Sequence, residues 1–260
     1  MSDEINPYQS PVPGQEEPAS AAEPTVPIDS SRRPFVPATR WAIATCICLA
    51  VDLVLEGGNL LLYARAYQYY TRAVENPQLD SSMIDYFFQY EVLVLTGISL
   101  MQLVTGLLLV RWMYVSHRNL SALGHDQLDT KAVLVVLGWF IPVLNLFCPF
   151  IVMREIWWRS DPLADNTRES ARSSDLVLWW WMAWVSALVT AFWLNWFVTR
   201  SESLSQMLLD LRGNLALSVF RMIAAVLLIL VIRGVDRSQL ERHRRILSGD
   251  LVLPPLPSDE

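Results

Sequence analysis

Long apolar runs alternate with shorter polar stretches over most of the chain, and each of these runs approaches the length of a membrane span. A helix needs about 20 apolar residues to cross a hydrocarbon core of about 30 Å. The pattern therefore predicts an all-α integral membrane protein and argues against a soluble globular domain. The apolar segments are 41–63, 92–115, 132–153, 176–198 and 211–232.

The third segment differs from the others because Gly138, Pro142, Asn145 and Pro149 interrupt it. Proline removes a backbone donor and its ring clashes with the preceding turn, so a straight helix is not expected here. Two alternatives remain open. The segment is either a re-entrant or interfacial hairpin that enters and leaves on one side, or a kinked fifth span.

The distribution of Lys and Arg discriminates between these alternatives, because basic residues concentrate on the cytoplasmic side. If every segment crosses, the two sides carry 8 and 11 basic residues, leaving out Arg221 within the last segment. If the third segment does not cross, they carry 15 and 4. The second distribution is typical of membrane proteins. We therefore predict four spanning helices, a re-entrant third segment and both termini in the cytoplasm.

Polar segments flank the predicted transmembrane domain, residues 41–233. Residues 1–40 are rich in proline and acidic residues and lack apolar periodicity, which predicts a disordered tail. Residues 234–260 are predicted to be a cytoplasmic C-terminal tail. Its basic residues near the membrane either attract anionic lipid, at about 1 kcal/mol per charge, or act only as a topology signal. These residues are Arg242, Arg244 and Arg245.

Composition excludes several functions. The net charge of −6 argues against nucleic-acid binding. Cys46, Cys48 and Cys148 lie in apolar runs and are typical of small packing residues. The chain lacks the short motifs of zinc proteases, α/β-hydrolases, P-loop proteins and dinucleotide-binding enzymes. We therefore predict a protein that is not an enzyme and uses no cofactor or metal.

Three ionisable residues lie within predicted spans, where charge is costly and often functional. Asp52 and Glu56 are four residues apart on one face of the first span. Arg221 in the last span lies at the same predicted depth as Asp52, about 16 Å from the cytoplasmic end. We expect Asp52 and Arg221 to pair across a helix–helix contact, with Glu56 nearby. A structural ion pair, a proton or ion pathway, and a contact with another protein all remain open.

Two motifs resemble an uncharacterised bacterial membrane family, domain of unknown function 4328, over roughly residues 92–240. The first runs from Trp112 to Asn119, and the second has the pattern W-F-x-P-x-x-N-L-x-x-P followed by E-x-W. The first departs from the family, which has Arg-Ala where this chain has Val115-Ser116. The residues that would form a shared site are Trp112, Arg118, Asn119, Pro142, Asn145, Pro149, Arg154, Glu155 and Trp157.

The resemblance implies a protein of the bacterial cytoplasmic membrane but no activity. If the third segment is re-entrant, Arg118 and Asn119 would face Arg154 and Glu155 at the cytoplasmic end. They would close a structural joint there or line a gate. Asn145, between two prolines, would place an amide and free carbonyls inside the membrane.

These observations favour a non-enzymatic scaffold, sensor or regulatory component of the membrane. The alternative is a small channel or transporter subunit that uses Asp52, Glu56, Arg221 and the broken helix around Asn145. The missing motifs argue against a third class, an enzyme acting on lipid. A protein partner or a homo-oligomer is compatible with each class, and the sequence identifies neither.

Overall fold

The computed structural model describes residues 34–76, 82–125, 127–162, 175–198, 204–251 and 253, and most of these are helical. The long helices are α1 (Thr39–Glu75), α2 (Ser82–Ala122), α6 (Asp175–Trp193) and α7 (Leu204–Leu247). A π-helical turn, Leu194–Val198, continues α6. Most of the predicted N-terminal tail lies outside the described residues.

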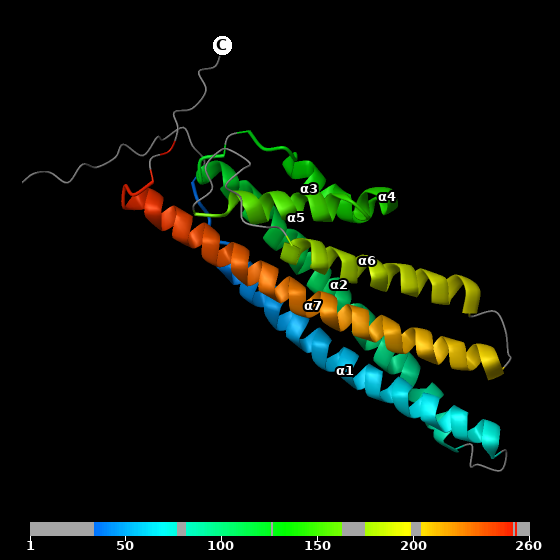
Figure 1. Cartoon of the computed structure of the whole chain (residues 1–260). Coiled ribbons are helices and arrows are strands. Elements are labelled where there is room, and N and C mark those ends of the chain that lie inside the picture. Colours follow the sequence, from blue (N-terminus) through cyan, green and yellow to red (C-terminus); the bar gives the residue numbers. More distant parts are fainter. Residues whose placement is uncertain are drawn as a thin grey trace, which may run out of the picture. The chain divides into compact units, whose positions relative to one another are not determined.

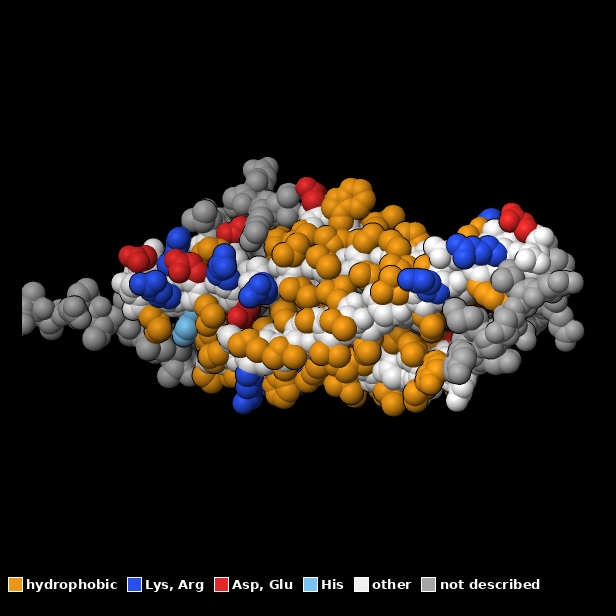
Figure 2. Space-filling model, turned by 90° about the horizontal axis from the view of Figure 1, so that it is seen from below, with side chains coloured by type: hydrophobic (Ala, Val, Ile, Leu, Met, Phe, Trp, Pro, Cys, Tyr) orange, Lys and Arg blue, Asp and Glu red, His pale blue; other side chains and the backbone are white. Residues whose placement is uncertain are grey.

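Four helices are long and apolar enough to cross a membrane, which confirms the predicted number of spans. They are Thr39–Ala73, Gln89–Ala122, Asp175–Phe197 and Ser205–Leu247. On the face seen in Figure 2, hydrophobic side chains form a broad central band, and most charged side chains gather toward the two ends. This is the surface that a bilayer-spanning protein presents to lipid.

The helices extend beyond the predicted apolar segments because their polar ends remain helical. The clearest case is α7, which continues through most of the predicted C-terminal tail and ends at Leu247. Ion pairs one turn apart, such as Glu241 with Arg245 at 3.0 Å, support a helix in this polar part. The tail predicted to begin at residue 234 is therefore helical over its first half.

The long helices pack in the order α2, α1, α7, α6, so that α1 and α7 form the centre and α2 and α6 the edges (Figure 1). Neighbours run antiparallel. Thr39 at the start of α1 donates a hydrogen bond to Asp236 near the end of α7 (3.1 Å). Val36, just before α1, bonds to Asn119 near the end of α2. The start of α1 and the ends of α2 and α7 therefore lie together.

The third apolar segment folds as a helical hairpin made of α3 (Ala132–Phe140), α4 (Pro142–Asn145) and α5 (Cys148–Arg159) (Figure 1). A Cβ added at Gly138 would lie 2.6 Å from the Cβ of Cys148, so α3 and α5 touch. The kinked fifth span is therefore wrong. The reason is local, because each proline lies in the first turn of a new helix, where its missing N–H costs nothing.

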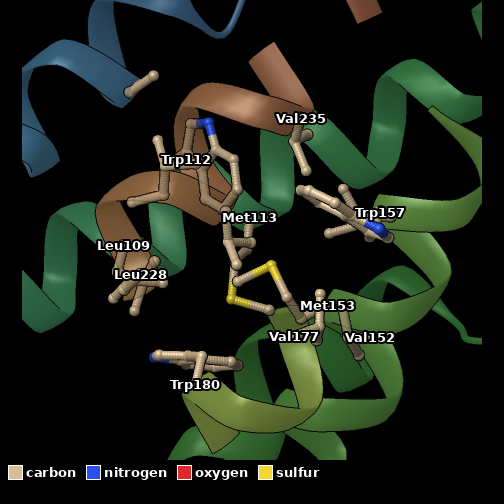
Figure 3. Close-up of a cluster of buried hydrophobic side chains, with 14 of the residues drawn as sticks. Leu109, Trp112, Met113, Val152, Met153, Trp157, Val177, Trp180, Leu228 and Val235 are labelled. Atoms are coloured by element: carbon tan, nitrogen blue, oxygen red, sulfur yellow. The ribbon is translucent and has the colours of Figure 1, made fainter. Parts of the chain in front are cut away.

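A dry core attaches the hairpin to the spanning helices. Side chains from α2, α5, α6 and α7 meet there, and most are fully buried (Figure 3). Trp157 of α5 packs so closely on α7 that a Cβ at Gly234 would lie 2.6 Å from its ring. The core residues labelled in Figure 3 are Leu109, Trp112, Met113, Val152, Met153, Trp157, Val177, Trp180, Leu228 and Val235.

Candidate functional site

A cavity of about 300 Å³ lies among α1, α2, α6 and α7. These four helices are the candidate membrane spans. This volume is at the lower end of the range for small-molecule sites. Most of its wall is apolar, and Trp139 of the hairpin forms part of it. The polar lining consists of Asp52, Glu56, Gln102, Thr105 and Arg221.

Glu56, rather than Asp52, is the partner of Arg221. The Nη1 atom of Arg221 donates to Oε1 of Glu56 at 3.0 Å, and Gln102 donates to the same oxygen at 3.3 Å. Asp52 instead accepts a hydrogen bond from Thr105 at 2.7 Å. The predicted Asp52–Arg221 pair is therefore wrong, because matched depth does not determine which turn of α1 faces Arg221.

Each carboxylate keeps one oxygen without a partner. Asp52 and Glu56 are 7% and 2% exposed, yet Oδ1 of Asp52 and Oε2 of Glu56 have no hydrogen-bond partner among the described residues. A buried acceptor left unpaired costs about 1–3 kcal/mol. Both residues line the cavity, and a rotation of either side chain would turn its buried, unpaired oxygen toward a bound molecule.

A row of polar contacts, here called the polar seam, continues from the cavity along α1. Asn59 donates to Ser218 of α7 at 3.2 Å. Further along the same face, Tyr63 donates to Glu91 of α2 at 2.9 Å. Arg212 of α7 then donates to the hydroxyl of Tyr67 at 2.7 Å. The seam therefore leads away from the hairpin end of the molecule.

The seam residues on α1 share one helical face, since they are spaced three or four positions apart. Sequence reasoning missed Tyr63 and Tyr67 because tyrosine also fits an apolar run. The spacing of polar side chains after Glu56 was the signal that could have found them. Toward the hairpin, by contrast, the cavity meets Leu109, Trp180 and Leu228, where the dry core begins.

Glu155 of the family motif lies at the base of the hairpin rather than in the cavity. It accepts hydrogen bonds from the backbone of Asp129 (2.7 Å) and Thr130 (3.1 Å) and from the Thr130 hydroxyl, and it forms an ion pair with Arg159 at 3.1 Å. His117 of α2 contacts the same Thr130 hydroxyl at 3.0 Å. Burial alone would raise the pKa of Glu155, but the surrounding donors lower it to about 2.

A second polar group joins four segments beside Glu155. The amide of Asn119 exchanges two hydrogen bonds with the backbone of Val36 and also donates to Gln239 at 3.2 Å. Gln239 of α7 in turn donates to the Ser116 carbonyl (2.9 Å) and the Ser160 hydroxyl (3.0 Å). Together with the Glu155 contacts, this group forms what we call the joint.

The two arginines of the motif do not take part in the joint. Arg118 and Arg154 are exposed, and each lies over an aromatic ring of its own helix, Tyr114 and Phe150 respectively. The prediction that they face each other is wrong, because neighbouring residues of a helix point about 100° apart. Of the two neighbouring pairs, Asn119 and Glu155 are buried in the joint, whereas the arginines beside them are exposed.

Asn145 lies apart from the cavity, at the end of α4. Its side-chain oxygen is buried without a hydrogen-bond partner among the described residues. Beside it, Trp181 of α6 donates to the carbonyl of Leu146 at 2.9 Å, which attaches the hairpin tip to a spanning helix. The structure therefore does not bring Asn145 together with Asp52, Glu56 and Arg221. Pro142 is exposed near the same tip and Pro149 is buried.

Arg242, one of the arginines for which the sequence leaves lipid contact or a topology signal open, is buried, with only 5% of its surface exposed. Its guanidinium donates to the carbonyl of Leu123 at 3.0 Å and to that of Asp161 at 2.7 Å. It therefore fastens α7 to the ends of α2 and α5. Burial, helped by the charge of Arg242, lowers the pKa of nearby His125 to about 4. Arg244 is exposed.

The fold and the cavity together define a multi-pass helical membrane protein with a polar site inside its bundle. More particularly, residues 76–237 match the family described as Domain of unknown function (DUF4328), so the chain belongs to this family. No curated protein and no solved structure matches the chain. The matched range includes the hairpin, the cavity's tryptophans and Arg221, whereas α1 with its two carboxylates precedes it.

Proposed function

We propose that this protein is a non-enzymatic sensor that binds a small molecule in its intramembrane cavity and signals occupancy through the hairpin. One observation carries the proposal. Trp139 near the end of α3 lines the cavity, while Asp129 and Thr130 just before α3 are bound by Glu155 in the joint. A helix of nine residues spans about 13 Å, so α3 acts as a short rigid lever between cavity and joint.

The polar seam supports sensing over conduction. A channel needs a polar path through the whole membrane, but the polar contacts from the cavity lead only toward the end away from the hairpin. On the hairpin side, the cavity meets the fully buried side chain of Trp180, which belongs to the same apolar core cluster as Val177. A site that is polar toward one side and sealed toward the other suits a ligand that binds and leaves by the same route.

The test compares two bulky substitutions on α2. A Cβ added at Gly106 or at Gly97 meets nothing within 4 Å, so both positions accept a larger side chain. Gly106 lines the cavity, whereas Gly97 is an exposed residue that does not. Gly106→Phe fills the cavity and is expected to change the hydrogen exchange of residues 127–140 in lipid nanodiscs. Gly97→Phe is the control.

The two outcomes are distinct. If only Gly106→Phe alters exchange in α3 and in the residues before it, cavity and joint are coupled as proposed. If its effect stays within α2, the cavity is not coupled to the joint and the sensor proposal fails.

A transporter remains the second candidate. Asp52 and Glu56 lie in one candidate span and Arg221 in another, and ionisable groups within spans often carry protons or ions. Proton flux into liposomes containing the full chain tests it. Flux that Asp52→Asn abolishes would replace the sensor with a transporter. The sensor proposal predicts no flux above that of protein-free liposomes.

We propose that the joint faces the cytoplasm of a bacterium and that both termini lie on that side. The support is the count of basic residues, 15 against 4. Single cysteines at positions 76 and 161, in a chain whose native cysteines are replaced, test this orientation. A membrane-impermeant thiol reagent added to intact cells is expected to label position 76 and not position 161. The reverse labelling would contradict it.

We further propose that an anionic lipid contact is made by a set of arginines that shares only Arg244 with the set considered from the sequence. Arg233, Arg237 and Arg244 line a groove between α1 and α7 together with apolar side chains and the carboxylates of Asp236 and Glu241. Guanidinium groups beside apolar side chains suit a phosphate headgroup with its acyl chains.

A further inference from the structure

Two carboxylate oxygens of the cavity lining have no hydrogen-bond partner among the described residues. The two donors near Glu56, from Arg221 and Gln102, both go to its Oε1 atom, and the donor from Thr105 goes to Oδ2 of Asp52. Oδ1 of Asp52 and Oε2 of Glu56 are left over, as is the Nε1 donor of Trp139. A molecule that satisfies the two carboxylate oxygens must donate hydrogen bonds.

The charge balance leads to the same conclusion. Glu56 and Arg221 form an ion pair, so their charges offset each other. Asp52 has a hydroxyl partner but forms no ion pair with Arg221. An unpaired carboxylate in an apolar environment is costly, and a cationic ligand relieves that cost. Side chains one helical turn apart have Cβ atoms about 5–6 Å apart, so one ammonium group can lie near both carboxylates.

The remaining wall suits an apolar body attached to that ammonium group. Trp139, Trp180 and Trp184 come from the hairpin and from α6, and the rings of Trp139 and Trp184 meet edge to face at 5.9 Å. Indole faces attract cations and apolar groups alike. A water molecule occupies roughly 30 Å³ of liquid, so a cavity of about 300 Å³ holds on the order of ten non-hydrogen atoms.

We propose that the ligand is a small lipophilic ammonium ion: a protonated amine on a compact apolar body. Its N–H groups donate to Asp52 and Glu56, and its apolar body lies against the three tryptophans. The inference rests on the proposed sensor function, because it names the ligand class for the same cavity.

Three probes with one apolar cage test the charge preference. They are 1-adamantylammonium, 1-adamantanol and 1-adamantanecarboxylate, which differ mainly in the polar group. Binding of each to the full chain in lipid nanodiscs is measured by equilibrium dialysis, with binding to protein-free nanodiscs subtracted. The ammonium probe is expected to bind at least about tenfold more tightly than the other two, as a hydrogen bond to a charged partner implies.

Three variants locate the effect. Asp52→Asn keeps the acceptor for Thr105 but removes the charge, and should weaken ammonium binding about tenfold while leaving the alcohol unchanged. Gly106→Phe should abolish binding of every probe that enters the cavity. Asp175→Asn neutralises an exposed carboxyl group that lies neither in the cavity nor in the polar seam, and should change nothing.

Carboxylate binding as tight as ammonium binding would overturn the inference, and so would an Asp52→Asn variant with full ammonium affinity. If Asp52→Asn does not fold, the probe series on the unaltered chain and on Gly106→Phe still decides. The sensor proposal fails separately. The alcohol or the carboxylate could instead bind to the unaltered chain, lose that binding in Gly106→Phe, and alter hydrogen exchange in α3. In that case the sensor proposal stands and the ammonium-ligand proposal fails. If no probe binds and Gly106→Phe leaves α3 unchanged, both fail.

Discussion

The joint and the cavity both contain buried carboxylates, but the carboxylate oxygens have different numbers of hydrogen-bond partners in the two regions. Both oxygens of Glu155 accept hydrogen bonds, from two backbone amides and a hydroxyl, and the carboxylate also forms an ion pair with a guanidinium. Asp52 and Glu56 each keep one oxygen without a partner beside a cavity. Burial alone therefore does not identify a functional carboxylate. The number of donors around it separates a structural group from one that can bind a ligand.

The two regions also differ in their relation to the family. The joint residues Asn119 and Glu155 lie inside the matched range, 76–237, and so do the tryptophans of the cavity. Asp52 and Glu56 are on α1, before that range. The walls of the cavity thus come from the family region and its two carboxylates from the helix that precedes it.

Removing Glu155 should have the largest effect on stability. Glu155→Ala removes a buried ion-pair partner of Arg159, which keeps only its pair with the exposed Asp129, and leaves two backbone amides unpaired. Breaking a buried ion pair typically costs about 3–5 kcal/mol. Thermal unfolding of the full chain in detergent, together with hydrogen exchange at residues 127–131, measures this loss. The control is Arg154→Ala, which removes the exposed neighbour and should cost less than about 0.5 kcal/mol. Equal losses would contradict the assignment of the joint.

Arg242 should rank next. Arg242→Ala removes hydrogen bonds from a charged donor to two backbone carbonyls. Leaving such buried acceptors unpaired should cost about 1–3 kcal/mol. Arg244→Ala, two residues further on an exposed face, should be nearly neutral. Denaturant unfolding monitored by tryptophan fluorescence compares them. If Arg244→Ala destabilises as much, Arg242 is not the residue that fastens α7.

Acid should loosen the joint by a smaller amount, and the sign follows from both pKa shifts. Since the pKa of His125 is lowered from 6.5 to about 4, unfolding takes up a proton in that range, and stability falls as the pH drops below 6.5. Glu155, lowered from 4.5 to about 2, adds a further loss below 4.5. Unfolding curves between pH 7 and pH 3 measure this, and His125→Asn should flatten the upper range. A stability that rises in acid would contradict both assignments.

The lipid groove should show the smallest effect. Replacing Arg237 and Arg244 with glutamine removes two surface charges, each worth about 1 kcal/mol of attraction to an anionic membrane. Native mass spectrometry should then detect severalfold less phosphatidylglycerol bound to the protein. Arg118→Gln, an exposed arginine outside the groove, is the control and should retain the lipid. Unchanged retention in the double variant would leave Arg233, Arg237 and Arg244 as a topology signal alone.

Much of the fold could be predicted from the sequence, because its signals are local. Run length predicted the four spans, and Pro142 and Pro149 together with the basic residues predicted the hairpin. The partner of Arg221 could not be predicted, since hydrophobicity sets depth but not the rotation of α1 against α7. The burial of Arg242 could not be predicted either, because the carbonyl groups that it binds belong to the backbone of distant segments.

The central claim is that occupancy of the cavity changes the hairpin. Hydrogen exchange of the full chain in lipid nanodiscs, with and without 1-adamantylammonium, tests it most directly. We predict that the probe changes exchange in α3 and at residues 127–131, and that Gly106→Phe no longer responds to it. Bound probe with unchanged exchange in both segments would contradict the claim, since the cavity would then bind a ligand without signalling to the joint.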